Sequence, residues 1–255
     1  MALPISCLQN ASGYRFLGMP RAPFSEGVVA LPGYRLIRAT LRQPCSLEEA
    51  LPRIASYLGN QGHSLVSLAG LELRAPRVMT RQEFRACNRD YLSALRQYGF
   101  LATDNVSIAR SNVVPLSNPP ETHHLLAFTW AAKSDEQMDF PDFLLSGCPE
   151  YASEPDRVIA AGDNSEAGMA QKALFVFRWL EEHVERLGSA WNRASCVQIY
   201  TRDEASIAEK YVAGCLKDIQ PNISFLRCLV PVEGFGGASF EFEADMRAVR
   251  EERII

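Results

Sequence analysis

The chain has 255 residues, of which 47% are hydrophobic and 22% are charged, and its formal net charge is −4. These values are typical of a globular protein with a substantial core and room for one large domain or two ordinary ones. They argue against a membrane protein, because no uncharged apolar run reaches the length of a span. They also argue against a nucleic-acid partner, because no basic stripe with interleaved aromatics is present.

The seven cysteines are odd in number and form no CxxC pair, which favours reduced thiols in a cytoplasmic protein. The first residues show no basic region followed by an apolar segment, so a secretory signal is not expected. The four histidines have no metal-ligand spacing, and the adjacent His123 and His124 would alternate faces on a strand. We therefore expect no metal site.

The first half shows a regular order of periodic segments. It predicts a helix, a strand, a second helix and two further strands at 46–59, 64–74, 79–99, 105–115 and 124–132, in that order. Pro52 lies in the early turns of the first helix and predicts a late start or a bend. The second helix begins with Thr80 and Glu83, which have the spacing of a capping box.

The second half repeats this order with low residue identity. Its helix, strand, helix and two strands are predicted at 165–187, 195–201, 200–220, 223–231 and 239–246. Thr201 and Glu204 again have capping-box spacing. Two copies of one α+β unit explain this layout better than one large sheet. We place the copies at residues 1–135 and 136–255, which meet in a polar stretch.

An arginine interrupts the apolar face of one strand in each half. At period 2, Arg110 falls in the apolar row of 105–115, and Arg227 falls in that of 223–231. Burying an unpaired guanidinium is expensive, so such an arginine is expected to be paired with a carboxylate or available for an anion. The planar fork of arginine suits a substrate carboxylate.

Four short motifs are distributed over the two halves. They are Ser146-Gly147, Asn88 with Tyr91 on the second helix of the first half, the two arginine strands, and Glu241 with Glu243 in FEFEA. As a set they resemble the Rid/YjgF family of enamine and imine deaminases. The sequence departs from that family in lacking the proline before the Ala-Arg position. In the first half, Ala127 and Thr129 stand where the glutamates would fall.

The resemblance implies an α+β fold of two tandem chorismate-mutase-like domains, each a mixed β-sheet with two helices packed on one face. It implies sites between neighbouring domains, a homotrimer of two-domain chains, and a small-molecule carboxylate as substrate, with no metal or organic cofactor. The site residues expected are Arg227, Glu241 and Arg110 for catalysis, and Ser146, Gly147, Glu243 and His124 for substrate binding.

Each role follows from the chemistry of its group. An arginine would hold the substrate carboxylate, and Glu241 would orient a water and carry its proton. Backbone groups at Ser146-Gly147 would receive the other end of the substrate, while His123 or His124 would contact an anionic group. Structural alternatives stay open: Arg227 can form an ion pair with Glu241 or Glu243, and Arg110 can be exposed or lie at a domain interface.

The two-domain length resembles the members that deaminate 2-aminomuconate or its chloro derivative in aromatic degradation, releasing ammonia. Two alternatives remain: a general deaminase of 2-aminoacrylate-type imines, and a non-catalytic carboxylate-binding or scaffold protein on the same fold. The glycine-rich stretch at 234–239 lacks the spacing of a phosphate loop and is interpreted as a connection between strands.

Overall fold

The structure, a computed structural model, describes residues 5–6, 12–20, 22–102, 105–153, 156–216, 219, 221–234 and 239–255. Cys7 and most of the glycine-rich stretch at 234–239 lie outside the described residues. No helix in the described ranges is long and apolar enough to cross a membrane.

The first half begins with three strands and then alternates helices with strands. Its elements are β1 (Ile5–Ser6), β2 (Tyr14–Gly18), β3 (Ser25–Ala30), β4 (Tyr34–Ser46), α1 (Leu47–Asn60), β5 (Leu68–Arg74), α2 (Arg81–Gln97), β6 (Leu101–Ala102), β7 (Asn105–Val106), β8 (Ala109–Pro115) and β9 (His124–Lys133). The capping box of Thr80 and Glu83 is confirmed at the start of α2. Of the two alternatives predicted from Pro52, the late start is wrong, because α1 already begins at Leu47, and the bend stays a prediction.

The second half repeats the helix–strand order with shorter strands before it. Its elements are β10 (Phe143–Leu145), β11 (Cys148–Pro149), β12 (Tyr151–Ser153), β13 (Asp156–Val158), α3 (Glu166–Arg186), β14 (Cys196–Thr201), α4 (Ala205–Val212), β15 (Asn222–Leu229), β16 (Phe242–Ala248) and β17 (Glu251–Ile254). The predicted capping box of Thr201 and Glu204 is wrong. Thr201 ends β14 with its hydroxyl 3.1 Å from that of Tyr211, and α4 begins after Glu204 without a side-chain cap.

One mixed sheet joins the two halves. Within the described residues it has thirteen strands in the order β1-β2-β3-β10-β16-β14-β15-β8-β5-β9-β4-β17, with β11 paired to β16. β10 of the second half pairs with β3 of the first, and β17 pairs in parallel with β4. The two arginine-bearing strands, β8 and β15, meet only through Val114–Pro115 and Cys228–Leu229.

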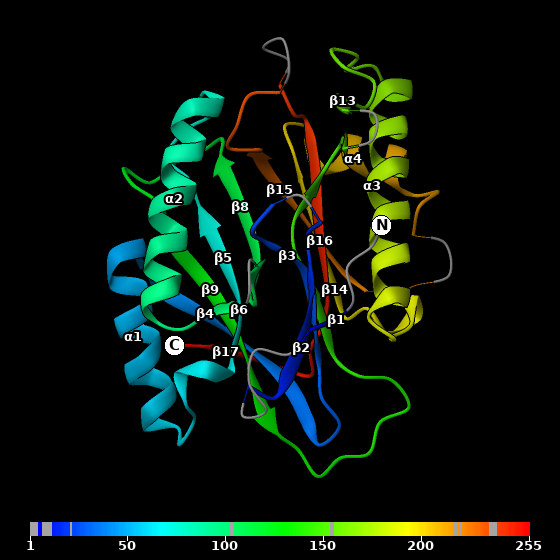
Figure 1. The fold of residues 1–255 in the computed structure, drawn as a ribbon. Coiled ribbons are helices and arrows are strands. Elements are labelled where there is room, and N and C mark those ends of the chain that lie inside the picture. The colour runs from blue at the N-terminus through cyan, green and yellow to red at the C-terminus, as the bar shows by residue number, and fades with distance from the viewer. Residues whose placement is uncertain are drawn as a thin grey trace.

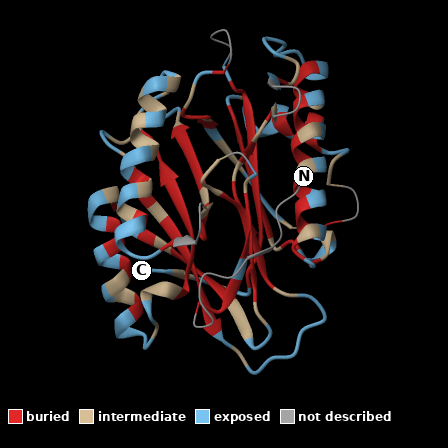
Figure 2. Ribbon diagram, viewed as in Figure 1, coloured by how far each residue is buried: buried red, intermediate tan, exposed pale blue. Residues whose placement is uncertain are grey.

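Helices cover the outside of the strands on two sides. Figure 1 shows α1 and α2 on one side of the molecule and α3 on the other, with the strands between them. Figure 2 shows that these strands are buried along most of their length, while each helix buries one face. The α+β fold class predicted from the sequence is confirmed. The division predicted after residue 135 falls in the connection between β9 and β10 and stays a prediction.

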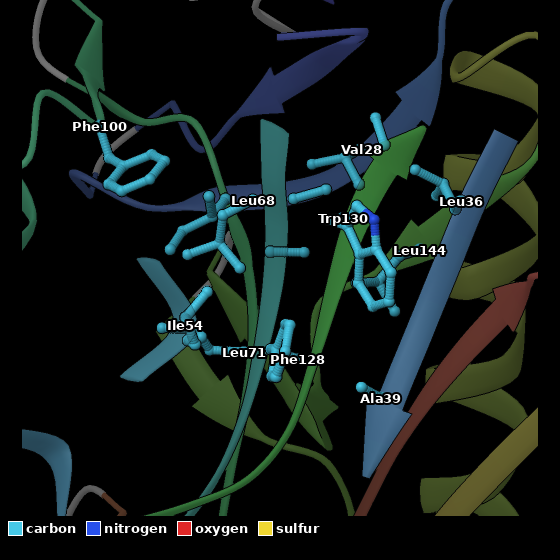
Figure 3. Close-up of a cluster of buried hydrophobic side chains, with 14 of the residues drawn as sticks. Val28, Leu36, Ala39, Ile54, Leu68, Leu71, Phe100, Phe128, Trp130 and Leu144 are labelled. Atoms are coloured by element: carbon cyan, nitrogen blue, oxygen red, sulfur yellow. The ribbon is translucent and has the colours of Figure 1, made fainter. Parts of the chain in front are cut away.

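Two apolar cores lie beneath the helices, and β3 contributes to both. Val28 and Ala30 belong to the first core, whereas Val29, pointing the other way, belongs to the second. This alternation is the period of a strand that is buried on both faces. Figure 3 shows the first core, in which Trp130 and Phe128 of β9 lie among side chains from several other strands and from α1.

A buried polar network fills the space where the halves face each other. Arg38 on β4 donates to Glu72 on β5 at 2.6 and 2.8 Å. The side-chain amide of Gln198 on β14 donates to Glu72 at 3.2 Å and to Asp245 on β16 at 3.3 Å. Tyr200 donates to Asp245 at 2.7 Å. Since buried charges persist only when paired and hydrogen-bonded, the network fixes the contact between the halves.

Candidate active site at the junction of the halves

Arg110 lies on β8 with its side chain toward α2. Its guanidinium carbon is 4.8 Å from the ring centre of Tyr91 on α2 and 4.6 Å from that of Phe24. Its Nη1 donates to the side-chain oxygen of Asn88 at 2.9 Å. Two aromatic faces and one neutral acceptor hold the cation without neutralising it.

No carboxylate of the described chain forms an ion pair with Arg110. Burial lowers the pKa of Arg110, while Tyr91 and the charge of Glu243 act in the opposite direction. A guanidinium keeps its charge under such conditions. The remaining donors of Arg110 are therefore available for an anion, which answers the question raised by an arginine in an apolar row.

The second half supplies Ser146 and Gly147 to the same place. The backbone N–H of Arg110 donates to the Ser146 hydroxyl at 3.1 Å, and that hydroxyl donates to the carbonyl of Ser25 at 2.7 Å. The N–H of Gly147 donates to the carbonyl of Arg110 at 3.1 Å. The structure thus brings three predicted site residues together across the junction.

Glu243 on β16 lies against Gly147. A β-carbon at position 147 would be 2.0 Å from Oε1 of Glu243, so only glycine leaves room for this carboxyl group. Burial, followed by the charges of Asp245 and Glu150, raises the pKa of Glu243 to about 8, although Arg110 and Arg74 oppose the shift. Near pH 7 the group is therefore mostly protonated and does not neutralise Arg110.

A small cavity of about 20 Å³ opens beside Arg110. Its polar lining consists of Asn88, Tyr91, Arg110, Asn112 and His123, and the rest of the lining is leucine, phenylalanine and cysteine. The Tyr91 hydroxyl and the Asn112 side-chain oxygen are buried without a hydrogen-bond partner in the described structure. Burial and the charge of Arg110 lower the pKa of His123.

Arg227 lies elsewhere. It is about half exposed on β15 and forms an ion pair with Glu204 at 2.8 Å, also exposed. Its Nε donates to the carbonyl of Arg202 at 3.3 Å. The structure therefore does not bring Arg227 to Arg110, and its ion-pair partner is neither of the glutamates considered from the sequence.

Glu241 is also separated from the cavity. Its carboxylate is 2.9 Å from Nε of Arg202, an ion pair that lacks hydrogen-bond geometry, and it accepts a hydrogen bond from Ser239. Its backbone N–H donates to Glu150 at 2.5 Å. His124 begins β9 opposite Ser46 and Arg74, and it is the neighbouring His123 that lines the cavity.

Sequence reasoning identified the other residues around Arg110 unevenly. Asn112 follows Arg110 by two residues on the same strand, so the period of a strand already placed the two side chains on one face. His123 was considered only together with its neighbour. Phe24 carries no local signal, because its contact with Arg110 depends on how β3 crosses between the halves.

A larger cavity of about 710 Å³ lies at the opposite end of β3, beside the connection between β9 and β10. It holds none of the motif residues. Two of its arginines are paired with carboxylates, Arg250 with Asp142 at 2.9 Å and Arg35 with Glu251 at 3.0 Å. Within the described residues, no group of histidine, cysteine and acidic side chains has the arrangement of a metal site.

An arginine strand is met by a Ser-Gly turn on an α+β fold, which brings together two of the motifs that resemble the Rid/YjgF family. A family model described as "2-aminomuconate deaminase CnbZ" matches residues 7–253. The chain therefore belongs to the CnbZ family of 2-aminomuconate deaminases, enzymes that cleave a carbon–nitrogen bond. This confirms the resemblance drawn from the motifs.

Among curated proteins, the 2-amino-5-chloromuconate deaminase of Comamonas testosteroni is 30% identical over 204 residues, which cover 78% of this chain and 80% of that protein. Solved structures with a similar fold include the YjgF gene product of E. coli, at 14% identity and a TM-score of 0.33. RidA from an Antarctic Psychrobacter has 13% identity and a TM-score of 0.33. Each covers 47% of this chain, and they are covered over 87% and 88% of their own lengths.

Proposed function

We propose that this protein hydrolyses 2-aminomuconate or its chloro derivative and releases ammonia, with the active site at Arg110. The family and the curated relative support the substrate class. The observation that carries the placement is the partly buried guanidinium of Arg110, which has no ion-pair partner in the described chain, beside a cavity with unpartnered polar groups. A substrate carboxylate would accept two parallel hydrogen bonds from it.

The two halves contribute different parts of this site. The first half supplies Arg110 and Asn88, which orients the guanidinium. The second half supplies Ser146 and Gly147, which fix the backbone of β8, and Glu243, whose neutral form leaves the arginine charge available. A cavity of about 20 Å³ is too small to hold the diacid, so the substrate would approach Arg110 from the cavity mouth.

Arg227 and Glu241 have no part in the proposed site. The second carboxylate of a muconate does not reach Arg227 here, since that residue lies on β15 in an exposed pair with Glu204. Comparing the two arginines tests the proposal directly. Arg110→Ala removes charge-assisted hydrogen bonds worth about 3 kcal/mol, a loss of roughly a hundredfold in kcat/KM. Arg227→Ala leaves kcat/KM within about threefold, because an exposed pair contributes little.

The experiment measures ammonia release from freshly generated 2-aminomuconate, its 5-chloro derivative and 2-aminoacrylate, for the natural protein and both variants. Far-ultraviolet circular dichroism shows that each variant is folded. Equal activity of Arg110→Ala and the natural protein would remove Arg110 from the site. Turnover of 2-aminoacrylate alone would replace the muconate with a simple imine acid as the substrate.

A second candidate is a carboxylate-binding protein without turnover. It is favoured by Ala127 and Thr129 on β9, which stand where the family has glutamates, and by the neutral state of Glu243 near pH 7. The two candidates differ in the fate of the ligand. A binding protein returns the bound aminomuconate unchanged, whereas a deaminase consumes it with one ammonia per molecule.

We also propose a homotrimer. The supporting observation is the outer edge of β15 in the described chain. Asn222–Arg227 pair with β14 on one side, while on the other side the first half contacts the end of the strand, through Leu116 at Arg227 and through β8 at Cys228–Leu229. Unpaired strand edges in native proteins are covered or blunted. Light scattering after size exclusion gives the mass in solution, and a species of about 28.4 kDa, the mass of one chain, would contradict the assembly.

A further inference from the structure

Three polar side chains face the cavity beside Arg110 without hydrogen-bond partners. The Tyr91 hydroxyl and the Asn112 side-chain oxygen are buried and unpartnered, and no described residue hydrogen-bonds to the imidazole of His123. All three come from different elements: α2, β8 and the turn before β9. Binding of a substrate carboxylate by Arg110 does not by itself explain why these three groups converge on one small space.

Leaving such groups unpaired is unfavourable. Each buried donor or acceptor without a partner costs about 1–3 kcal/mol, and native structures contain few of them. Two at one cavity indicate a polar occupant that accepts from one group and donates to another. Tyr91 can donate its O–H, while the oxygen of Asn112 can only accept.

The size of the cavity selects the occupant. Its volume is about 20 Å³, and a single water needs roughly 10–15 Å³ on this scale together with two to four polar partners. Tyr91, Asn112 and His123 supply three. A hydrolytic deaminase needs one such water next to the carboxylate-bearing carbon, and Arg110 is the residue that would hold that carboxylate.

His123 is in the form that can take a proton. Burial and the nearby charge of Arg110 hold the pKa of His123 below its ordinary value of 6.5, so the ring is neutral near pH 7. Its position is fixed, because its carbonyl accepts the N–H of Leu47 at the start of α1 at 2.9 Å. A neutral imidazole has one ring nitrogen free to accept.

We propose that His123 is the proton carrier of the reaction, acting on a hydrolytic water that Asn112 and Tyr91 hold beside Arg110. This inference rests on the proposed deaminase function and adds to it the residues that handle water and proton. Asn112 and Tyr91 are not among the catalytic or substrate-binding residues predicted from the sequence. His123 was considered there only as an alternative contact for an anionic group.

The chemistry balances without a further reagent. A solvent proton first adds to the enamine carbon of 2-aminomuconate and gives the iminium. The water oxygen then bonds to the iminium carbon, the carbon–nitrogen π pair moves to nitrogen, and His123 takes one water proton. His123 then returns that proton to nitrogen. The carbon–nitrogen bond breaks as the hydroxyl oxygen forms the carbonyl, and the hydroxyl proton passes through His123 to the departing ammonia. The iminium and water give a carbonyl and ammonium.

The other groups that line the cavity determine whether a pH-dependent loss of rate can be assigned to His123. The lining residues from α1 and β5 are leucines. The titratable groups near His123 are Cys87 and Tyr91 from α2, and the charged group is Arg110 from β8. Burial raises the pKa of Tyr91 to about 12. No carboxyl group of the described chain lines the cavity. A loss of rate toward acid pH that depends on His123 therefore belongs to its imidazole.

The test compares His123→Gln with His63→Gln, a histidine outside the cavity, using the full-length protein and 2-aminomuconate. We expect His123→Gln to lower kcat by about 100-fold or more, the usual contribution of a general base, with KM changed by less than threefold. The natural protein should lose kcat/KM toward acid pH with an apparent pKa below 6.5, and the variant should lack that limb. His63→Gln should keep both.

Two further variants separate catalysis from structure. Added imidazole should restore part of the activity of His123→Ala, which a purely structural role would not allow. Asn112→Leu fills the cavity without an acceptor and should lower kcat while Arg110 still binds substrate. An unchanged pH limb or unchanged kcat in His123→Gln, with Arg110→Ala inactive, overturns this inference but keeps the proposed function. Absence of ammonia release by the natural protein overturns both.

Discussion

The backbone N–H of Gly147 donates to the carbonyl of Arg110 at 3.1 Å. Through this bond a turn of the second half fixes the strand that carries the arginine of the first. The same turn leaves room for the carboxyl group of Glu243, which would collide with any β-carbon at position 147. The position of Arg110 therefore depends on both halves, although its side chain contacts α2.

Replacing Gly147 should disturb the site by steric contact alone. In Gly147→Ala the new methyl would lie 2.0 Å from Oε1 and 3.0 Å from the carboxyl carbon of Glu243, so the buried carboxyl group or the turn must move. A displacement of about 1 Å at β8 can cost up to roughly 100-fold in kcat/KM. Steady-state assays with 2-aminomuconate measure this loss.

The matched control is the double variant Gly147→Ala with Glu243→Ala, which removes the colliding group. The two substitutions should be strongly non-additive, because they act on one contact. Additive losses in the two single variants would show that the contact between Gly147 and Glu243 does not govern the position of β8.

Glu243 should also make the stability of the fold fall as pH rises. Its pKa is about 8 in the fold against an ordinary 4.5, so the folded protein binds more protons than the unfolded chain between these values. The contribution is complete below pH 4.5 and is lost as pH rises toward 8. Its slope is at most about 1.4 kcal/mol per pH unit for one proton.

Urea unfolding between pH 5 and 9 measures this slope in the natural protein and in Glu243→Gln. Glu150, whose pKa burial raises to about 7, adds a second proton at the lower end of the range. Between pH 7 and 8 the slope should therefore come mostly from Glu243 and should disappear in the variant. A slope that persists there unchanged would assign it to another group.

Local pattern predicted most elements but not their caps or lengths. The capping-box spacing occurs at Thr80 and at Thr201, yet only Thr80 caps a helix. Thr201 is the last residue of a buried strand, and its hydroxyl contacts Tyr211 instead. Spacing alone does not say where a strand ends, because that depends on pairing with β16, where the partner of Thr201 is Phe242.

The two arginine strands show why the site was only half predictable. Arg110 and Arg227 have the same local pattern, but their side chains differ in exposure. The turn at Ser146 packs against β8 at Arg110, whereas at Arg227 the outer edge of β15 receives the N–H of Leu116 at 2.9 Å and the side chain stays about half exposed. Burial of an arginine is thus decided by a remote segment. The local pattern predicted both arginines as site residues, and contacts with distant segments place only Arg110 at the cavity.

Loss of one partner of the buried ion pair between Arg38 and Glu72 is expected to destabilise the fold. Both side chains are buried, with two hydrogen bonds of 2.6 and 2.8 Å between them. Glu72→Ala leaves the buried guanidinium of Arg38 with the partly exposed Glu252, at 3.2 Å, as its ion-pair partner, and should cost up to about 3–5 kcal/mol in the free energy of unfolding. Urea denaturation at pH 7 measures the change.

Replacing both partners gives the control. Arg38→Met with Glu72→Leu substitutes apolar groups of similar volume, and such replacements are often neutral or stabilising by about 1–4 kcal/mol. A double variant as unstable as Glu72→Ala would mean that Gln198 and Asp245, which share this network, need the carboxylate of Glu72.

Glu241 and Glu243 are two residues apart near the same strand, and their substitution should have different effects. Glu241 is paired with Arg202, which is about half exposed, and lies away from the cavity. Glu241→Gln should therefore leave kcat/KM for 2-aminomuconate within about threefold, since loss of a partly exposed pair is worth roughly 1 kcal/mol or less. A loss of 100-fold or more would restore Glu241 as the proton-transfer group and place the chemistry in the second half. The pH profile of the same variant then decides between the carboxyl group and His123, because a carboxylate base and an imidazole base lose activity at different acid pH.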